Sequence, residues 1–179
     1  LAPWDAEAFR TAVDDSIEHL AAVGATPTWV LSNHDMVRHL TRYGGGEIGT
    51  RRARAAALLL LALPGAAYLY QGEELGLPEV TELPDDARRD PTFRRTKGRE
   101  PGRDGCRVPI PWSGGGPSYG FGPGTASWLP QPGEWAELSH AAQAGDPTSM
   151  LALYRGALRR RRDLLGGDEF AWLDAPPGG

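Results

Sequence analysis

The sequence predicts an α/β fold built on a parallel sheet, and two observations support this prediction. Segments with helical periodicity alternate with short apolar runs in the order helix, strand, helix, strand, which is typical of parallel α/β proteins. The apolar runs are continuous rather than alternating, as in strands that are covered on both faces. We therefore expect both strands to be buried on both faces.

The first helix is predicted over residues 6–23. Asp5 is a suitable N-cap, and Gly24 is a suitable stop. Apolar residues recur at spacings of four, four and three and mark one face of this helix: Phe9, Val13, Ile17 and Leu20. The first strand follows at residues 28–31.

The second helix is predicted over residues 51–63, with Thr50 as its cap after a glycine-rich loop. It is apolar all round after a charged start, so we expect it to be buried. Pro64 and Gly65 end it, and residues 66–72 form the second strand.

A long segment of little periodicity, about residues 71–147, separates the second strand from a last helix over 148–165. Loops of this length are uncommon in compact domains and are usually functional. Beyond Gly167, the stretch "EFAWLD" could begin a strand of a further domain.

Composition excludes several classes of function. The formal net charge of −4 is mild, which argues against nucleic-acid binding. Cys106 is the only cysteine, so no intrachain disulfide forms, and this fits the cytoplasm. The longest apolar stretch is too short to span a bilayer, and no signal peptide is visible. No dinucleotide-binding motif, P-loop or nucleophile elbow occurs in the sequence.

Polar residues stand directly behind the first predicted strand, in "LSNHDMVRH". The carboxyl ends of parallel strands are where sites are built, above all in (β/α)8 barrels. Asp35 could stabilise a cation, act as a base or bind a metal, and His34 could donate to a ligand hydroxyl. The alternative is an Asn/Asp turn with a packed histidine.

Three other groups have both a structural and a functional interpretation. Glu73 and Glu74 end the second strand, and we favour capping or ion pairing for them. The loop stretch "GREPGRDGCRVPIPW" carries arginines whose forks suit carboxylates and paired hydroxyls, with solvated ion pairs as the alternative. Residues 159–162 are four arginines, interpreted as a solvated face or inter-domain contacts.

Three stretches in this order resemble the later part of a glycoside hydrolase family 13 α-glucosidase: "TWVLSNHDMVRHLTRYG", "LLLALPGAAYLYQGEELGLPEV" and "GRDGCRVPIPW". The resemblance is to the maltase and oligo-1,6-glucosidase branch of actinobacterial type and extends over residues 3–165. It implies an α/β fold that is the C-terminal portion of a (β/α)8 TIM barrel, from helix six to helix eight. Residues 1–166 would be this partial catalytic barrel, with the strand-eight loop at 71–147. Residues 167–179 would be a linker and the start of a C-terminal β-sandwich domain.

The resemblance also implies roles for the polar residues. Residues 28–33 would be strand seven and residues 66–70 strand eight. The family hydrolyses α-glucosidic bonds with retention, and Asp35 matches the aspartate that supports the oxocarbenium-like transition state. His34 and Arg103 match residues that hydrogen-bond glucose hydroxyls and help to keep Asp35 ionised, and Arg107 matches a second arginine.

The same resemblance implies that this chain is inactive by itself. The nucleophile Asp and the acid/base Glu of the family lie on strands four and five, which have no counterpart here. We expect no cofactor and no metal ligand, an α-glucoside oligosaccharide as substrate, and no nucleic acid or membrane as partner. We also expect the rest of a barrel or self-association to cover the open edges, with Trp29 and Tyr70 lacking partners.

Two alternatives remain open. One is a glucosyl-transferring relative that forms trehalose or isomaltulose. The other is a non-catalytic interaction protein, which would leave Asp35, His34 and Arg103 apart or their pocket filled. Aromatic residues of the long loop are candidates for the side of the site that faces the leaving group, although core packing is favoured for most: Trp112, Tyr119, Phe121, Trp128 and Trp135.

Overall fold

The structure is a computed structural model, and it describes residues 2–124, 126–165, 167 and 170–173. In this part of the chain, helices and strands follow in the order α1 (Ala6–Ala21), β1 (Thr28–Val30), α2 (His39–Arg42), α3 (Gly46–Ala62), β2 (Ala66–Tyr68), α4 (Pro91–Arg95), α5 (His140–Gln143) and α6 (Met150–Leu164). Short 3₁₀ turns occur at 104–107, 117–120 and 133–136.

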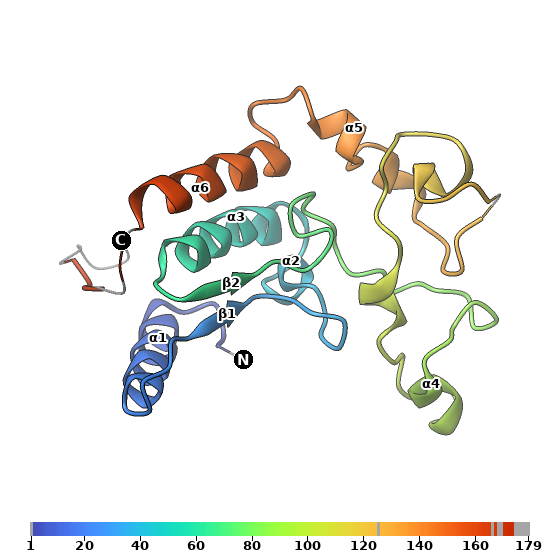
Figure 1. Cartoon of the computed structure of the whole chain (residues 1–179). Coiled ribbons are helices and arrows are strands. Elements are labelled where there is room, and N and C mark those ends of the chain that lie inside the picture. Colours follow the sequence, from blue (N-terminus) through green and yellow to red (C-terminus); the bar gives the residue numbers. More distant parts are fainter. Residues whose placement is uncertain (1, 125, 166, 168–169, 174–179) are drawn as a thin grey trace.

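The two strands pair in parallel, as predicted, with Trp29 opposite Ala67. Helices α3 and α6 lie side by side over one face of this pair (Figure 1). Side chains from that face pack against a cluster formed mainly by the two helices: Leu40, Ala53, Ala57, Leu60, Leu61, Met150 and Tyr154. We call this cluster the helix core.

The opposite face of the strand pair is exposed, so the prediction of strands buried on both faces was wrong. Val30 and its neighbour Tyr68 are 44% and 67% exposed. Successive side chains of a strand point to opposite faces, and α3 and α6 cover one face only. Among the described residues, a continuous apolar run is therefore compatible with a strand covered on one face.

Helix boundaries agree with the predictions except at the start of α3. Both α1 and α6 end within two residues of the predicted limits, and Asp5 caps α1 by accepting a hydrogen bond from the Ala8 N–H. Helix α3 begins at Gly46, so Thr50 lies inside it and its hydroxyl donates to the Gly46 carbonyl. Leu58 is half exposed, so α3 is not buried all round as expected.

The segment 71–147 has little regular structure, as predicted, yet it builds a core of its own. Its apolar side chains form a cluster that we call the loop core: Leu75, Leu77, Val80, Leu83, Val108, Ile110, Leu129, Trp135 and, from α6, Leu151. Trp135 is completely buried. The aperiodic sequence therefore still specifies a packed unit.

The expectation that Trp29 and Tyr70 lack partners was wrong. The Trp29 indole N–H donates to the Pro64 carbonyl at 2.6 Å, and the Tyr70 hydroxyl donates to the Cys106 carbonyl at 3.1 Å. Both side chains are half-buried. At the C-terminal end, residues 170–173 form no strand. The rest of the predicted β-domain start lies outside the described residues, so that prediction remains untested.

None of the helices in the described ranges is both long and apolar enough to cross a membrane.

Candidate active site

The loop that follows β1 presents Asp35 at the carboxyl end of the strand. The Asn33 side chain accepts a hydrogen bond from the Asp35 N–H at 2.9 Å, which forms the Asn/Asp turn considered from the sequence. The Asp35 side chain is 46% exposed, so the turn supports the carboxylate and does not bury it.

Arg103 and Arg107 both reach Asp35 from a 3₁₀ turn about 70 residues further along the chain. Arg103 Nη1 lies 2.8 Å and Arg107 Nη2 lies 3.0 Å from the same oxygen, Asp35 Oδ1. Arg107 Nε also donates to the His34 carbonyl at 2.8 Å. The His34 ring nitrogen Nε2 lies 3.4 Å from the other oxygen, Asp35 Oδ2.

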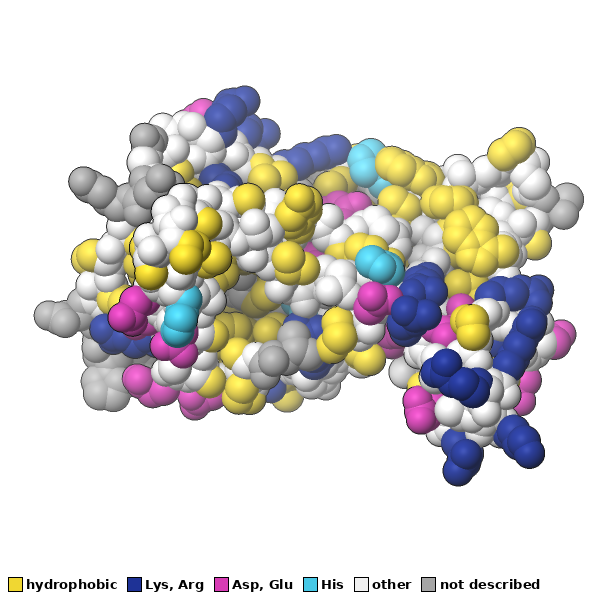
Figure 2. All heavy atoms as spheres, turned by 60° about the horizontal axis from the view of Figure 1, so that its bottom comes forward, with side chains coloured by type: hydrophobic (Ala, Val, Ile, Leu, Met, Phe, Trp, Pro, Cys, Tyr) yellow, Lys and Arg dark blue, Asp and Glu magenta, His cyan; other side chains and the backbone are white. Residues whose placement is uncertain are grey.

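All four residues predicted as a site therefore meet in one cluster. Figure 2 shows a histidine beside acidic and basic side chains on an open face, next to the lobe that carries α4. The non-catalytic alternative predicted that Asp35, His34 and Arg103 lie apart or that their pocket is filled, and the first of these two outcomes is not observed.

The cluster favours the ionised form of Asp35. Partial burial is the largest single influence and raises the pKa of Asp35, but the hydrogen bonds from Arg103 and Arg107 and the charges of His34 and Arg103 together outweigh it. The pKa of Asp35 is therefore below its usual value. The expectation that His34 and Arg103 help to keep this carboxylate charged agrees with this balance.

Arg103 is held in place by Asp90, which the sequence analysis did not single out. The Asp90 carboxylate is fully buried and accepts hydrogen bonds from Arg103 Nε at 2.6 Å and from the Arg103 N–H at 3.0 Å. Its other oxygen caps α4 through the Thr92 N–H. Gly102 has a positive φ of 72°, and a Cβ there would lie 2.8 Å from the Asp90 Cβ, so glycine is required.

Asp104 supports Asp90 in turn. Its buried carboxylate accepts hydrogen bonds from the Arg89 N–H at 2.7 Å and the Asp90 N–H at 2.8 Å. The sequence signal for Asp90 is its position directly before Pro91, because Asp before an N-terminal proline is a common helix start.

A second residue missed from the sequence, Arg38, joins the two halves of the site. It is 1% exposed, and its guanidinium donates to the Gln71 carbonyl at 2.8 Å and the Cys106 carbonyl at 2.9 Å. Its own N–H donates to Glu79 at 3.0 Å. Arg38 thus links the loop after β1, which holds Asp35, to the turn that holds the two arginines. The sequence feature that points to Arg38 is its position at the end of the stretch "NHDMVR", which also contains Asp35.

The two glutamates after β2 do not join the cluster. Glu74 accepts a hydrogen bond from the Gly72 N–H at 2.8 Å, which confirms the capping interpretation for this residue. Glu73 is buried and accepts a hydrogen bond from the Tyr154 hydroxyl at 3.3 Å. Burial raises the pKa of Glu73 to about 7.

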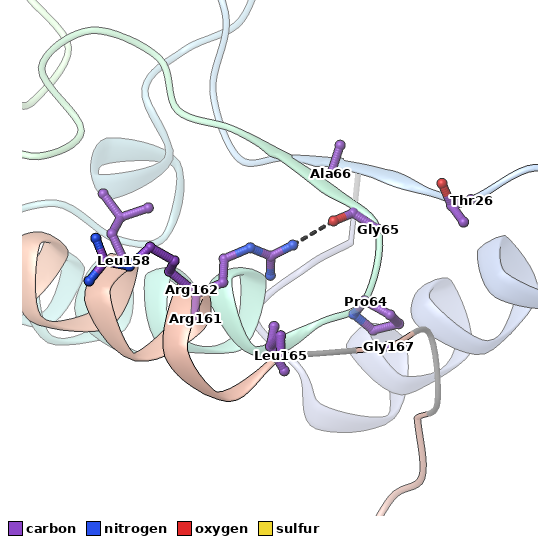
Figure 3. A pocket seen from close by; sticks show the side chains of 9 residues that line it. All are labelled: Thr26, Pro64, Gly65, Ala66, Leu158, Arg161, Arg162, Leu165 and Gly167. Atoms are coloured by element: carbon purple, nitrogen blue, oxygen red, sulfur yellow. Dashed lines mark hydrogen bonds between the residues drawn. The ribbon is translucent and has the colours of Figure 1, made fainter.

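The arginine run on α6 contains one residue with a specific structural role. Figure 3 shows that Arg161 points back to the end of α3, where its guanidinium donates to the carbonyls of Leu61, Leu63 and Gly65. The Leu61 and Leu63 carbonyls lie at the end of α3, where carbonyls lack intrahelical partners, and Gly65 lies in the turn that follows. The other three arginines of 159–162 are exposed, so the solvated-face interpretation was wrong for Arg161 only.

Of the five loop aromatics, only Trp135 belongs to the core. Trp112, Phe121 and Trp128 are exposed and Tyr119 is half-buried, so the expectation of core packing for most of them was wrong.

The cluster presents an anionic carboxylate beside fixed arginine donors on an open face. Within the described ranges, His, Cys, Asp and Glu side chains form no group of three that could hold a metal ion. Charged groups at the carboxyl end of a strand in a parallel β-α-β unit are the arrangement of an α/β enzyme site.

Comparisons with known proteins agree with the arrangement of an α/β enzyme site. Residues 1–166 match the model of the alpha-amylase family, "Alpha amylase, catalytic domain", and the chain belongs to this family. It is 39% identical over 159 residues to a probable alpha-glucosidase of Rhizobium meliloti, covering 87% of this chain and 28% of the relative.

The chain is also similar to solved structures. An alpha-glucosyl transfer enzyme, XgtA, is 36% identical with a TM-score of 0.76, over 90% of this chain and 29% of the enzyme. A trehalose-6-phosphate hydrolase of Bacillus licheniformis is 26% identical with a TM-score of 0.75, over 92% of this chain and 32% of the hydrolase. The chain thus spans about a third or less of the length of these relatives.

Proposed function

We propose that this chain is the part of a retaining α-glucosidase that supplies strands seven and eight of a (β/α)8 barrel, from helix six to helix eight. The observation that carries this proposal is the meeting of Asp35, His34 and Arg103 in one cluster at the carboxyl end of β1. Membership of the alpha-amylase family and the resemblance to an alpha-glucosidase support it. The substrate would be a maltose-type or isomalto-type oligosaccharide.

In this proposal, Asp35 supports the transition state. Two arginines bind Asp35 Oδ1, which leaves Oδ2 beside His34 to meet sugar hydroxyls and the positive charge that develops at the reacting carbon. His34 and Arg103 would donate hydrogen bonds to hydroxyls of the glucose being transferred. Arg107 would fix the backbone of His34 through its carbonyl.

The chain by itself should not turn over substrate, because the family places its nucleophile Asp and acid/base Glu on strands four and five. A supporting Asp cannot replace a nucleophile. We expect the purified 179-residue chain to release no measurable nitrophenol from p-nitrophenyl α-glucoside. Turnover within a few-fold of the Rhizobium relative would contradict this proposal.

A chimera tests the role of Asp35 directly. The matching segment of the Rhizobium alpha-glucosidase is replaced by this chain, and activity is compared with and without the substitution Asp35→Asn. We expect the substitution to lower kcat by about 10²–10³-fold, as for the loss of one transition-state contact. The matched control, Asp15→Asn on the exposed side of α1, should leave kcat unchanged. Equal activity of the Asp35→Asn chimera would refute the assigned role.

A glucosyl-transferring activity is the second candidate, and one observation favours it. XgtA, whose description is an alpha-glucosyl transfer enzyme, is 36% identical to this chain. The same active chimera distinguishes the two, because a transferase yields longer glucosides from maltose whereas a hydrolase yields glucose. For the whole protein we propose a cytoplasmic location, supported by the single, buried thiol of Cys106.

A further inference from the structure

A groove runs between two limbs of the long loop, residues 78–89 and residues 116–135. It consists of two adjoining cavities of about 440 and 610 Å³, which share Pro84, Pro130 and Gln131 as lining residues. Each cavity has the size of a small-molecule site. Neither is lined by Asp35, His34, Arg103 or Arg107, so the groove is separate from the proposed catalytic cluster.

The larger cavity presents an aromatic surface. Trp128 is 56% exposed and lines this cavity together with Tyr119. Phe121 meets the Trp128 ring in an edge-to-face arrangement, with centroids 5.6 Å apart, and is not a lining residue. Phe121 therefore braces the indole from outside the cavity. An exposed, braced indole offers an apolar plate against which a flat ligand face can pack.

Polar groups surround this aromatic surface. Arg89 and Asp86 line the larger cavity, while Glu79 and Glu134 line the smaller one. Carboxylates accept hydrogen bonds, and the Arg89 guanidinium donates them. A ligand that packs one apolar face on Trp128 and carries many hydroxyls would satisfy both kinds of group.

The wall that carries Tyr119 is strained. Ser118 and Tyr119 both have positive φ values, 51° and 47°, which are uncommon for residues other than glycine. The Tyr119 carbonyl accepts hydrogen bonds from the N–H groups of Trp112 and Ser113, and the Tyr119 hydroxyl donates to Gly133. Such strain costs about 1–3 kcal/mol per residue and is concentrated at binding sites.

The groove is rigidly connected to the proposed catalytic cluster. Arg89, on its rim, donates its N–H to the buried carboxylate of Asp104. The next residue, Asp90, holds Arg103, which in turn binds Asp35. A ligand in the groove would therefore sit at a fixed position relative to Asp35.

We propose that this groove binds a glucosyl oligosaccharide, with one pyranose ring packed on Trp128 and further hydroxyls directed to Glu134. Pyranose rings have one face of C–H groups and a rim of hydroxyls, which matches the lining. The choice of a glucosyl ligand rests on the proposed function.

The test is a titration of the 179-residue chain, labelled with ¹⁵N, with maltotriose. We expect the indole N–H signal of Trp128 to shift saturably, together with the amide signals of Tyr119 and Gln131. Trp128→Ala should weaken the affinity, measured from Tyr119 and Gln131, by about tenfold or more, because an apolar contact is lost. Trp128→Tyr, which keeps an aromatic face, should restore most of it.

Trp112→Ala is the matched control, because Trp112 is similarly exposed at 47% and lines neither cavity. It should leave the affinity measured from Tyr119 and Gln131 unchanged. Shifts confined to His34 and its neighbours would overturn the groove site and leave the proposed function standing. No shift at Trp128, or equal affinity of Trp128→Ala, would also overturn it. An inactive chimera would instead count against the proposed function and not against groove binding.

Discussion

The strand-helix region and the long loop each build an apolar core, but from very different backbones. The helix core is formed by two long helices over a parallel strand pair, whereas the loop core is formed by residues 75–135 with little regular structure. Helix α6 belongs to both, because Leu151 packs in the loop core and Tyr154 in the helix core.

The difference lies in how buried backbone groups find hydrogen-bond partners. Helices and strands satisfy their own, but an irregular chain needs side chains to do so. Gln143 donates to the Leu75 carbonyl at 2.9 Å and accepts from the Leu151 N–H at 3.1 Å. Arg38 and Asp104 serve other parts of the loop in the same way. A long loop can therefore hold charged side chains such as Arg103 in place if buried polar side chains supply the hydrogen bonds that helices and strands would otherwise make.

Breaking the loop core should have the largest effect. Trp135 is completely buried there, so Trp135→Ala should lower the free energy of unfolding by about 3–5 kcal/mol. Urea denaturation followed by circular dichroism measures this loss. Trp128→Ala, on the surface of the same loop, should cost less than about 0.5 kcal/mol. Equal losses for the two variants would mean that the loop core contributes little to stability.

Glu73, which accepts a hydrogen bond from Tyr154 of the helix core, is the titratable group with the next largest expected effect. Burial raises the pKa of Glu73 to about 7 from an ordinary 4.5, so the folded state binds its proton more tightly than the unfolded state. The stabilisation is therefore complete below pH 4.5 and is lost as the pH rises to about 7. It amounts to at most about 3 kcal/mol.

Comparison of the native chain with Glu73→Gln isolates this contribution. His39, whose pKa burial lowers to about 4, has the opposite dependence, because its stabilisation is present above pH 6.5 and is lost as the pH falls. The difference in unfolding free energy between native chain and variant should change between pH 4.5 and 7 and stay constant above pH 8. A difference for Glu73→Gln that does not change with pH would contradict the prediction.

The Arg103–Asp35 ion pair joins the two regions. Weakening it through Asp90 should give the smallest of these effects on stability and a clear electrostatic signal. Asp90→Asn removes the charge that holds Arg103 and should cost about 1.5–3 kcal/mol. With Arg103 less firmly placed, the pKa of Asp35 should rise, as followed by ¹³C NMR of its carboxyl carbon. Asp15→Asn should change neither quantity, and an unchanged Asp35 pKa in Asp90→Asn would show that Arg107 and His34 suffice.

Predictions from the sequence succeeded where the local sequence pattern is strong. They failed where burial depends on what another part of the structure covers. The α1 and α6 bounds and the parallel strand order follow from caps, periodicity and continuous apolar runs. The predicted start of α3, residue 51, was too late because a glycine-rich stretch favours a loop. The helix begins at Gly46, and Gly45 and Gly46 have φ values of 65° and 52°. The exposed face of β1 and β2 was missed because an apolar run does not say what covers it.

The sequence by itself determined the strand order, the main helices and the polar residues at the carboxyl end of β1. These depend on spacings of a few residues and on motifs that lie within one stretch of chain. Only the tertiary structure decided that Asp90 orients Arg103, that Arg38 joins the two loops and that Arg161 caps α3. Those contacts join residues 13 to 100 positions apart, and their hydrogen bonds depend on packing that no local pattern encodes.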